Sequence, residues 1–341
     1  MSIKKLLRNN IAQLLSLTGL TSPARSGRGR LSIATFHRVL TEAERQVYPL
    51  PGLCITPEEL DALLAYFAEH FDCGTLATQH ERYLGGEITT RPLLAITFDD
   101  AQHDNYFNAR PLLAKHQVKA SFFVPVEAVE QQEPLWHDRL GFAILALLNQ
   151  ADGGREKLTR ILDSAGLSAS RDDGLVGSII EASKKLPLQT RLGLIERLVV
   201  ASGTAQVPAF ARLMTFSEIA ELVRDGHEIG SHSMTHCLMP ECDDETLMYE
   251  LADSRRILQS HLGQRIESFC YPNGNSDIRT GEAVARAGYL RAVTTTWGNN
   301  GKNGDRFQLR RYNMDARRVF DSNGKLMPAI LAFRMSGLFP V

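Results

Sequence analysis

The alternation of short apolar runs with amphipathic segments constrains the fold of this chain most. Runs predicted as strands cover residues 31–40, 93–98, 119–124, 227–230, 267–271, 289–295 and 307–313. Helical patterns separate most of them. Strands that alternate with helices pair in parallel through right-handed crossovers. Six or seven such units around one core favour a closed barrel over an open sheet, so we expect an α/β fold of the deformed (β/α) barrel type.

One long segment interrupts the alternation. Residues 138–212 carry four helical patterns and no convincing strand, which predicts a helical insertion. The insertion follows the predicted strand 119–124, so it emerges at the face where parallel barrels build their sites. A lid over a substrate cleft and a dimerisation or purely structural appendage are both consistent with this position.

Residues 1–30 form a basic amphipathic segment and linker ahead of the barrel domain, which we place at residues 31–341. The first forty residues contain no acidic residue, and apolar residues recur at helical spacing between residues 3 and 15. Residues 1–20 could make peripheral contact with an anionic membrane, pack on the protein itself or act as a signal peptide. No run of 18 apolar residues suggests a transmembrane helix. We therefore expect a cytoplasmic location or a peripheral one at the inner membrane, with export as an alternative.

Charge and cysteine content exclude several classes of partner and site. The formal net charge is -1, so the sequence lacks the excess of basic residues that a nucleic-acid partner requires. Five cysteines include no Cys-x-x-Cys pair, which argues against both a disulfide framework and a cysteine zinc site.

Two adjacent carboxylates, Asp99 and Asp100, end the predicted strand 93–98. Like charges this close raise each other's pKa unless a cation compensates them. A bound divalent metal would resolve the conflict. Capping of the next helix by one carboxylate, with the other in water, is the structural alternative.

A second pattern strengthens the metal interpretation. His232 and His236 follow the predicted strand 227–230, and two imidazoles four residues apart share one side of a helical turn. One aspartate and two histidines at the ends of parallel strands supply three metal ligands and leave a position for water. A third strand, 267–271, ends in a Pro-Asn-Gly turn that exposes backbone N–H groups.

These residues resemble a known family. T-F-D-D at 97–100, H-S-M-T-H at 232–236 and F-C-Y-P-N-G at 269–274 look like the motifs of the polysaccharide deacetylases of the NodB homology class. Members of this family remove N-acetyl groups from chitin-like and cell-envelope glycans. The resemblance covers about residues 31–315 and implies the deformed barrel of the NodB type.

The resemblance also implies roles for the motif residues. Asp100, His232 and His236 look like the metal ligands, and the expected cofactor is a divalent ion, Zn²⁺ before others. Asp99 looks like the general base.

The remaining predicted site residues would contact the substrate. The backbone N–H of Asn273, in the turn after Tyr271, matches the oxyanion donor of the family. Trp297, after the predicted strand 289–295, is a candidate for lining the acetyl pocket.

Two positions depart from the family pattern. The late histidine that protonates the leaving amine is absent, because no histidine follows His261. His37, at the end of the first predicted strand, is our candidate for the acid. Cys270 stands where many members carry an arginine that tethers the base. Arg310 and Arg311 stay protonated, so either could neutralise the base or bind substrate, and we assign Arg310 to substrate binding.

We therefore expect a metal-dependent hydrolase that removes N-acetyl groups. Its expected substrate and partner is an N-acetylated glycan of an envelope polysaccharide, a glycolipid or a glycan precursor. A related hydrolase of a non-sugar amide or ester is one alternative. A glycan-binding protein that has lost turnover is the other.

Overall fold

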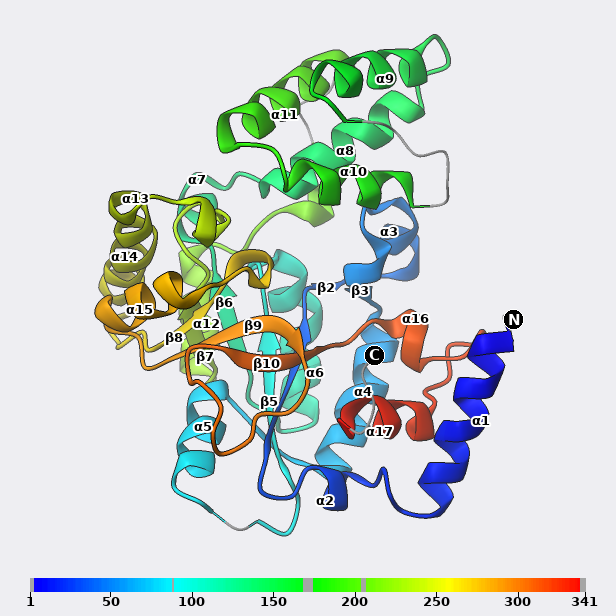
Figure 1. Ribbon diagram of the computed structural model, residues 1–341, viewed down its shortest axis with the longest axis vertical. Helices are drawn as coiled ribbons and strands as arrows, with labels where there is room; N and C mark the ends of the chain where they lie inside the picture. The colour runs from blue at the N-terminus through cyan, green and yellow to red at the C-terminus, as the bar shows by residue number, and fades with distance from the viewer. Residues whose placement is uncertain (1–2, 88, 168–173, 204–206, 338–341) are drawn as a thin grey trace.

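The computed structural model describes residues 3–87, 89–167, 174–203 and 207–337. Its centre is a closed barrel of parallel strands (Figure 1). Around the ring the barrel strands are β1 (Leu31–Phe36), β10 (Leu309–Asn313), β9 (Arg291–Trp297), β8 (Ser268–Cys270), β7 (Glu228–Ser231), β6 (Ser121–Val124) and β5 (Leu93–Phe98), and β5 pairs again with β1. β4 (Asp72–Gly74) pairs with the first half of β5. The predicted deformed (β/α) barrel is confirmed.

Helices surround the barrel on its outside. They are α4 (Pro57–His70), α5 (Leu76–Leu84), α6 (Arg110–Lys115), α7 (Val126–Gln131), α12 (Phe216–Arg224), α13 (Asp244–Met248), α14 (Ser254–Leu262), α15 (Ile278–Arg286), α16 (Ala316–Val319) and α17 (Pro328–Met335). Several begin with a capping box, as α4 does at Thr56 and α12 at Thr215. In each box the side chains satisfy backbone N–H groups at the helix start and so fix where the helix begins.

The first predicted strand, 31–40, forms two strands instead of one. β1 ends at Phe36, and β2 (Arg38–Val39) leaves the barrel to pair with β3 (Cys54–Ile55). The carboxylate of Asp104 fixes the chain at the point where it leaves the barrel, because it accepts a hydrogen bond from the backbone N–H of Val39 at 2.7 Å. His37 therefore lies at a break in the chain direction, at the rim of the barrel.

Alternation along β5 assigns its side chains to the two sides of the barrel wall. Leu93 and Ala95 pack in the interior cluster, whereas Leu94, Ile96 and Phe98 pack in the outer core beneath the helices. Period-two alternation is the rule for strands. Asp99, which follows Phe98, is thereby directed into the barrel.

Between α7 and α12, the chain forms a separate helical layer at one end of the barrel (Figure 1). It consists of α8 (Trp136–Leu148), α9 (Gly154–Ser164), α10 (Leu175–Ser183) and α11 (Leu188–Ser202). These helices bury an apolar cluster of their own, which includes Leu147, Leu162, Ile179 and Leu194. The layer can therefore keep its shape while it contributes side chains to the barrel rim.

The N-terminal helix α1 (Ile3–Leu17) packs against α17 and leads to the short helix α2 (Pro23–Ser26) (Figure 1). Ala12 is fully buried, whereas Leu14 and Leu17 are 62% and 86% exposed. No described helix has the length and apolar character needed to cross a bilayer. Membrane contact by residues 1–20 and the expected cellular location both stay predictions.

Candidate metal and catalytic site

The two carboxylates that follow β5 diverge. Asp99 continues the inward alternation, and its backbone N–H donates to the Phe36 carbonyl at 3.0 Å. Asp100 has left-handed backbone geometry, with φ of 74°, which sends its side chain to different partners. Both residues are buried, at 2% and 3% exposure. The adjacent charges are thus separated by backbone geometry.

Arg311 supplies the counter-charge of Asp99. Two guanidinium nitrogens of Arg311 donate to the two carboxylate oxygens of Asp99 at 2.8 and 2.7 Å, a bidentate pair. The guanidinium also donates to the Thr294 carbonyl and the Thr35 hydroxyl. Burial opposes ionisation of Asp99, but the charge and hydrogen bonds of Arg311 outweigh it and hold the pKa of Asp99 below its usual range. Asp99 is therefore a fixed, ionised carboxylate.

Asp100 lies against two imidazoles. Its Oδ1 is 3.4 Å from Nε2 of His232 and 3.3 Å from Nε2 of His236, and all three residues are buried. Ligand atoms bound at about 2.0–2.1 Å to a tetrahedral ion lie about 3.3 Å apart. The Asp/His group, defined here as Asp100, His232 and His236, therefore has the spacing of three ligands of one ion.

The two histidines meet through a loop, so the predicted helical turn at 232–236 is wrong. Ser233 and His236 have left-handed backbones, with φ of 67° and 57°. The Ser233 hydroxyl accepts the His236 N–H at 3.0 Å, and the carboxylate of Glu250 accepts the N–H of Met234 at 2.9 Å. These bonds replace the helical ladder and fix the loop.

The two imidazoles differ in their protonation. Nδ1 of His232 lies 2.7 Å from the Cys270 carbonyl, which can only accept, so Nδ1 carries a proton. Burial opposes protonation of His232, but Cys270 and the hydrogen bond to Asp100 outweigh it and hold the pKa of His232 well above its usual value. Burial lowers the pKa of His236 to about 4, so its ring is neutral at physiological pH. A metal would take the place of the proton on Nε2 of His232, and a carboxylate with two Nε2 atoms is a donor set typical of zinc and similar ions.

A second potential ligand group shares one histidine with the first. Asp99, His232 and Cys270 also offer ligand atoms within 4.8 Å of one another. However, Arg311 already neutralises the charge of Asp99, which makes that carboxylate a weaker metal ligand than Asp100. Burial raises the pKa of the Cys270 thiol, and a thiol must lose its proton to bind a metal. The chemistry therefore favours the Asp/His group.

A cavity of about 310 Å³, called the site cavity here, opens over these residues. Its barrel side is lined mainly by His37, Asp99, Asp100, His232, His236, Tyr271 and Asn273. Its other side is lined by Trp136, His137, Ile180, Glu181 and Lys184, from the helical layer. The insertion therefore forms one wall of the cavity that holds the Asp/His group.

His37 lies close to the predicted base. Its Nε2 is 3.7 Å from Oδ2 of Asp99, and its Nδ1 is buried without a hydrogen-bond partner among the described residues. Burial lowers the pKa of His37, and the nearby carboxylates of Asp99 and Asp100 oppose this effect only in part. The free ring is therefore neutral and can accept a proton.

The turn after β8 brings Tyr271 and Asn273 to the site cavity. Asn273 has left-handed geometry, with φ of 58°, inside the short 3₁₀ turn Pro272–Gly274. A Cβ at Gly274 would lie 2.1 Å from Oγ1 of Thr295, so glycine is required there. The turn is consequently packed closely against β9 at Gly274.

Lys184, just after α10, links the insertion to this turn. Its ammonium group donates to Oδ1 of Asn273 and pairs with Glu181 at 2.6 Å. Sequence reasoning missed Lys184, because its partner is 89 positions away and no local pattern marks the contact. The Trp136–His137 pair at the start of α8 also lines the site cavity.

Two predicted substrate contacts are not brought to the site cavity. Trp297 packs edge-on against Tyr312 and beneath the guanidinium of Arg334, which lies 4.6 Å from its ring. Arg310 is exposed, because the alternation along β10 gives the inward position to Arg311 instead. Neither residue is among those that line the cavity.

Comparisons with known proteins agree with the geometry. The family model described as polysaccharide deacetylase matches residues 86–165 and 198–292, just over half of the chain. The unmatched stretch between them falls within the helical layer. A comparison with curated protein sequences finds no match.

Three solved structures illustrate the similarity of fold. The deacetylase PplD of Streptococcus pyogenes, in complex with acetate, has a TM-score of 0.59 and 17% identity, over 90% of this chain and 98% of that chain. A polysaccharide deacetylase of Bacillus cereus has a TM-score of 0.52 and 14% identity, over 83% of this chain and 64% of that chain. IcaB of Ammonifex degensii has a TM-score of 0.50 and 18% identity, over 84% of this chain and 91% of that chain. At these identities the similarity concerns the fold alone.

The Arg311 pair predicts a large effect on stability. Arg311→Leu leaves Asp99 buried without its counter-charge and should lower the free energy of unfolding by about 3–5 kcal/mol at pH 7. Arg310→Leu, at the exposed neighbouring position, should change it by less than about 0.5 kcal/mol. Urea denaturation measures both. Similar costs for the two variants would contradict the assignment.

The same pair also predicts a pH dependence. The depressed pKa of Asp99 adds stability above about pH 4 that is lost as the pH falls through the folded-state pKa. This acid-induced loss should be smaller in Arg311→Leu, because Asp99 then no longer has a depressed pKa.

Proposed function

Because the chain belongs to the polysaccharide deacetylase family, we propose that it is a metal-dependent hydrolase of N-acetyl groups. The substrate is an N-acetylated sugar of an envelope polysaccharide, a glycolipid or a glycan precursor. One observation carries the proposal. An ionised, arginine-paired carboxylate lies beside an aspartate and two histidines with metal-ligand spacing, at the base of one cavity.

Asp100, His232 and His236 would hold the ion, with Zn²⁺ as the expected metal. When bound, a divalent ion polarises the acetyl carbonyl and lowers the pKa of a coordinated water towards 7. The hydrogen bond from His232 to the Cys270 carbonyl would orient that ligand. These residues therefore set the position of the scissile amide.

Asp99 is the general base of the proposed reaction. Arg311 keeps it ionised and fixed, and the carboxylate retains lone pairs for the proton of the attacking water. The backbone N–H of Asn273 would donate to the oxyanion that forms when the carbonyl carbon becomes tetrahedral. One such fixed donor contributes about 3–4 kcal/mol to transition-state stabilisation.

His37 completes the proton transfer. Because its ring is neutral and 3.7 Å from Asp99, it can receive the proton that Asp99 takes from water and pass it to the departing nitrogen. The C–N bond then breaks, the hydroxyl oxygen stays with the acetyl carbon as acetate, and the sugar leaves as a free amine. This relay would substitute for the late histidine that the sequence lacks.

Release of acetate from a substrate panel tests the proposed function. The panel should contain N-acetylated oligosaccharides, glycolipids and nucleotide sugars, together with non-sugar amides and esters, and the protein should be loaded with Zn²⁺. Acetate from an N-acetylated sugar supports the proposal. Release from non-sugar compounds only, or sugar binding without any acetate, would overturn it in favour of one of the alternatives.

Asp99→Asn should lower kcat by about 10²–10⁴-fold, because the amide cannot accept the proton of water. Elemental analysis of the purified variant should give the wild-type metal content, since Asp99 does not belong to the Asp/His group. Wild-type turnover in this variant would remove Asp99 from the role of base.

His37→Gln should slow amide hydrolysis at least about tenfold. It should slow hydrolysis of an aryl acetate much less, because an aryl oxide leaves without being protonated. His137→Gln is the matched control, since its ring lines the same cavity. If His137→Gln selectively lost amide hydrolysis and His37→Gln did not, the general acid would be His137 and not His37.

Lys184→Met should lower kcat about tenfold with little change in KM, because the turn that carries Asn273 loses its support from the insertion. Lys185→Met alters the exposed neighbouring lysine and should leave both constants unchanged. Equal effects of the two substitutions on kcat would contradict a positioning role for Lys184.

A further inference from the structure

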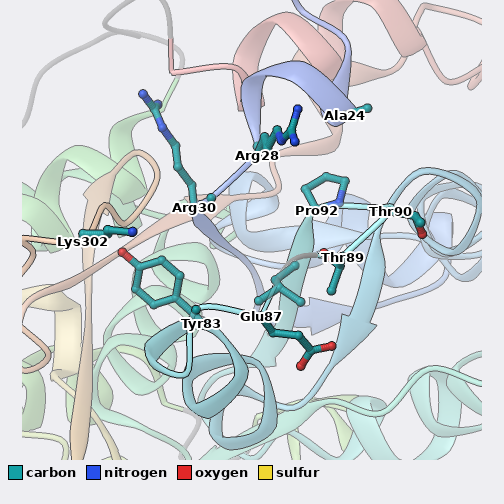
Figure 2. A pocket seen from close by; sticks show the side chains of 13 residues that line it. Ala24, Arg28, Arg30, Tyr83, Glu87, Thr89, Thr90, Pro92 and Lys302 are labelled. Carbon is teal, nitrogen blue, oxygen red and sulfur yellow. The ribbon is translucent and has the colours of Figure 1, made fainter.

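A second cavity lies at the end of the barrel opposite to Asp99. It has a volume of about 550 Å³ and is called the basal cavity here (Figure 2). It is lined by the residues that precede β1 and β5, by the end of α5, and by the loop between β9 and β10. Because all barrel strands run parallel, these segments gather at the amino-terminal ends of the strands, away from the site cavity.

Positive charge dominates the basal cavity. Arg28 and Arg30 line it from the segment before β1, and Lys302 lines it from the loop before β10 (Figure 2). Within the described part of the chain, none of the three forms an ion pair. Glu87 is the acidic residue of the lining, and Arg82 already binds both of its oxygens at 2.8 and 2.7 Å. The cavity therefore presents three uncompensated cations.

The backbone that carries these cations is fixed. Leu31 and Asn300 exchange backbone hydrogen bonds at 3.1 and 3.0 Å, which ties the start of β1 to the loop of Lys302. Gly27 lies directly against Pro92, since a Cβ at position 27 would lie 2.7 Å from Cβ of Pro92. The segments of Arg30 and Lys302 are therefore held in one arrangement before any ligand binds.

One hydroxyl group in the lining also lacks a partner. The Oη atom of Tyr83, at the end of α5, is shielded from solvent and makes no hydrogen bond to any described residue. A shielded hydroxyl without a partner is costly, so a ligand acceptor that reaches it after a small rotation of the Tyr83 ring would relieve that cost. The basal cavity thus offers an unused neutral donor beside its charged ones.

We propose that the basal cavity binds a phosphate-bearing ligand. A phosphate monoester carries a charge of about −1.5 to −2 and three strong acceptor oxygens at neutral pH, which suits two guanidinium groups, an ammonium group and a hydroxyl. The phosphate belongs either to a soluble phosphorylated compound or to the headgroup of an anionic lipid. This site is separate from deacetylation, because it shares no lining residue with the site cavity.

Two binding arms test the proposal at about 0.15 M ionic strength, where exposed charges are well screened. Glucose 6-phosphate is titrated calorimetrically in the first arm. In the second, the protein is sedimented with phosphatidylcholine vesicles with and without phosphatidic acid. We expect binding in at least one arm, and the arm that responds identifies the source of the phosphate.

Variants assign the binding to the basal cavity. The triple variant Arg28→Gln/Arg30→Gln/Lys302→Gln should bind the responding probe at least tenfold more weakly. Arg25→Gln, an arginine on α2 outside the cavity lining, should bind like the wild type. Tyr83→Phe should bind severalfold more weakly without loss of stability, since its hydroxyl makes no bond in the fold. Absence of binding in both arms, or equal binding by the wild type, the triple variant and Tyr83→Phe, would overturn the proposal.

Discussion

The buried pair between Arg311 and Asp99 determines how the rest of the site is arranged. The side chains of Arg311 and Asp99 are only 1% and 3% exposed, and removing two charges from water costs free energy. The ion pair is therefore stable only with good geometry and further hydrogen bonds. Thr35, Thr97 and the Thr294 carbonyl provide those bonds. With Asp99 neutralised in this way, Asp100 can face the two imidazoles without repulsion from its neighbour.

The barrel and the helical layer contribute different parts of the site. The barrel supplies Asp99, the Asp/His group and His37 from the carboxyl ends of its strands, where parallel barrels place their sites. The helical layer closes one side of the site cavity and reaches the Asn273 turn through Lys184. Because the layer has its own apolar cluster, it can support this contact without depending on the barrel core.

Local sequence patterns predicted the barrel and the strand ends that carry the site, because both follow from alternation and chain order. They also predicted that Asp100 meets His232 and His236, but they did not predict the other contacts across the fold. The histidines were expected on a helical turn, but Glu250 and Ser233 hold them in a loop. The choice between Arg310 and Arg311 depended on the strand register, and Lys184 depended on a contact between distant segments. Such contacts are set by tertiary packing, which single-sequence patterns do not contain.

The division of roles between the adjacent carboxylates is the central claim, and the ligand atoms of the bound metal test it most directly. X-ray absorption spectroscopy of the zinc-loaded protein distinguishes the two groups that share His232. We predict a shell of nitrogen and oxygen at about 2.0–2.1 Å with no sulfur, as Asp100, His232 and His236 require. A sulfur scatterer at about 2.3 Å would place the metal on Cys270 and Asp99 and would contradict the account.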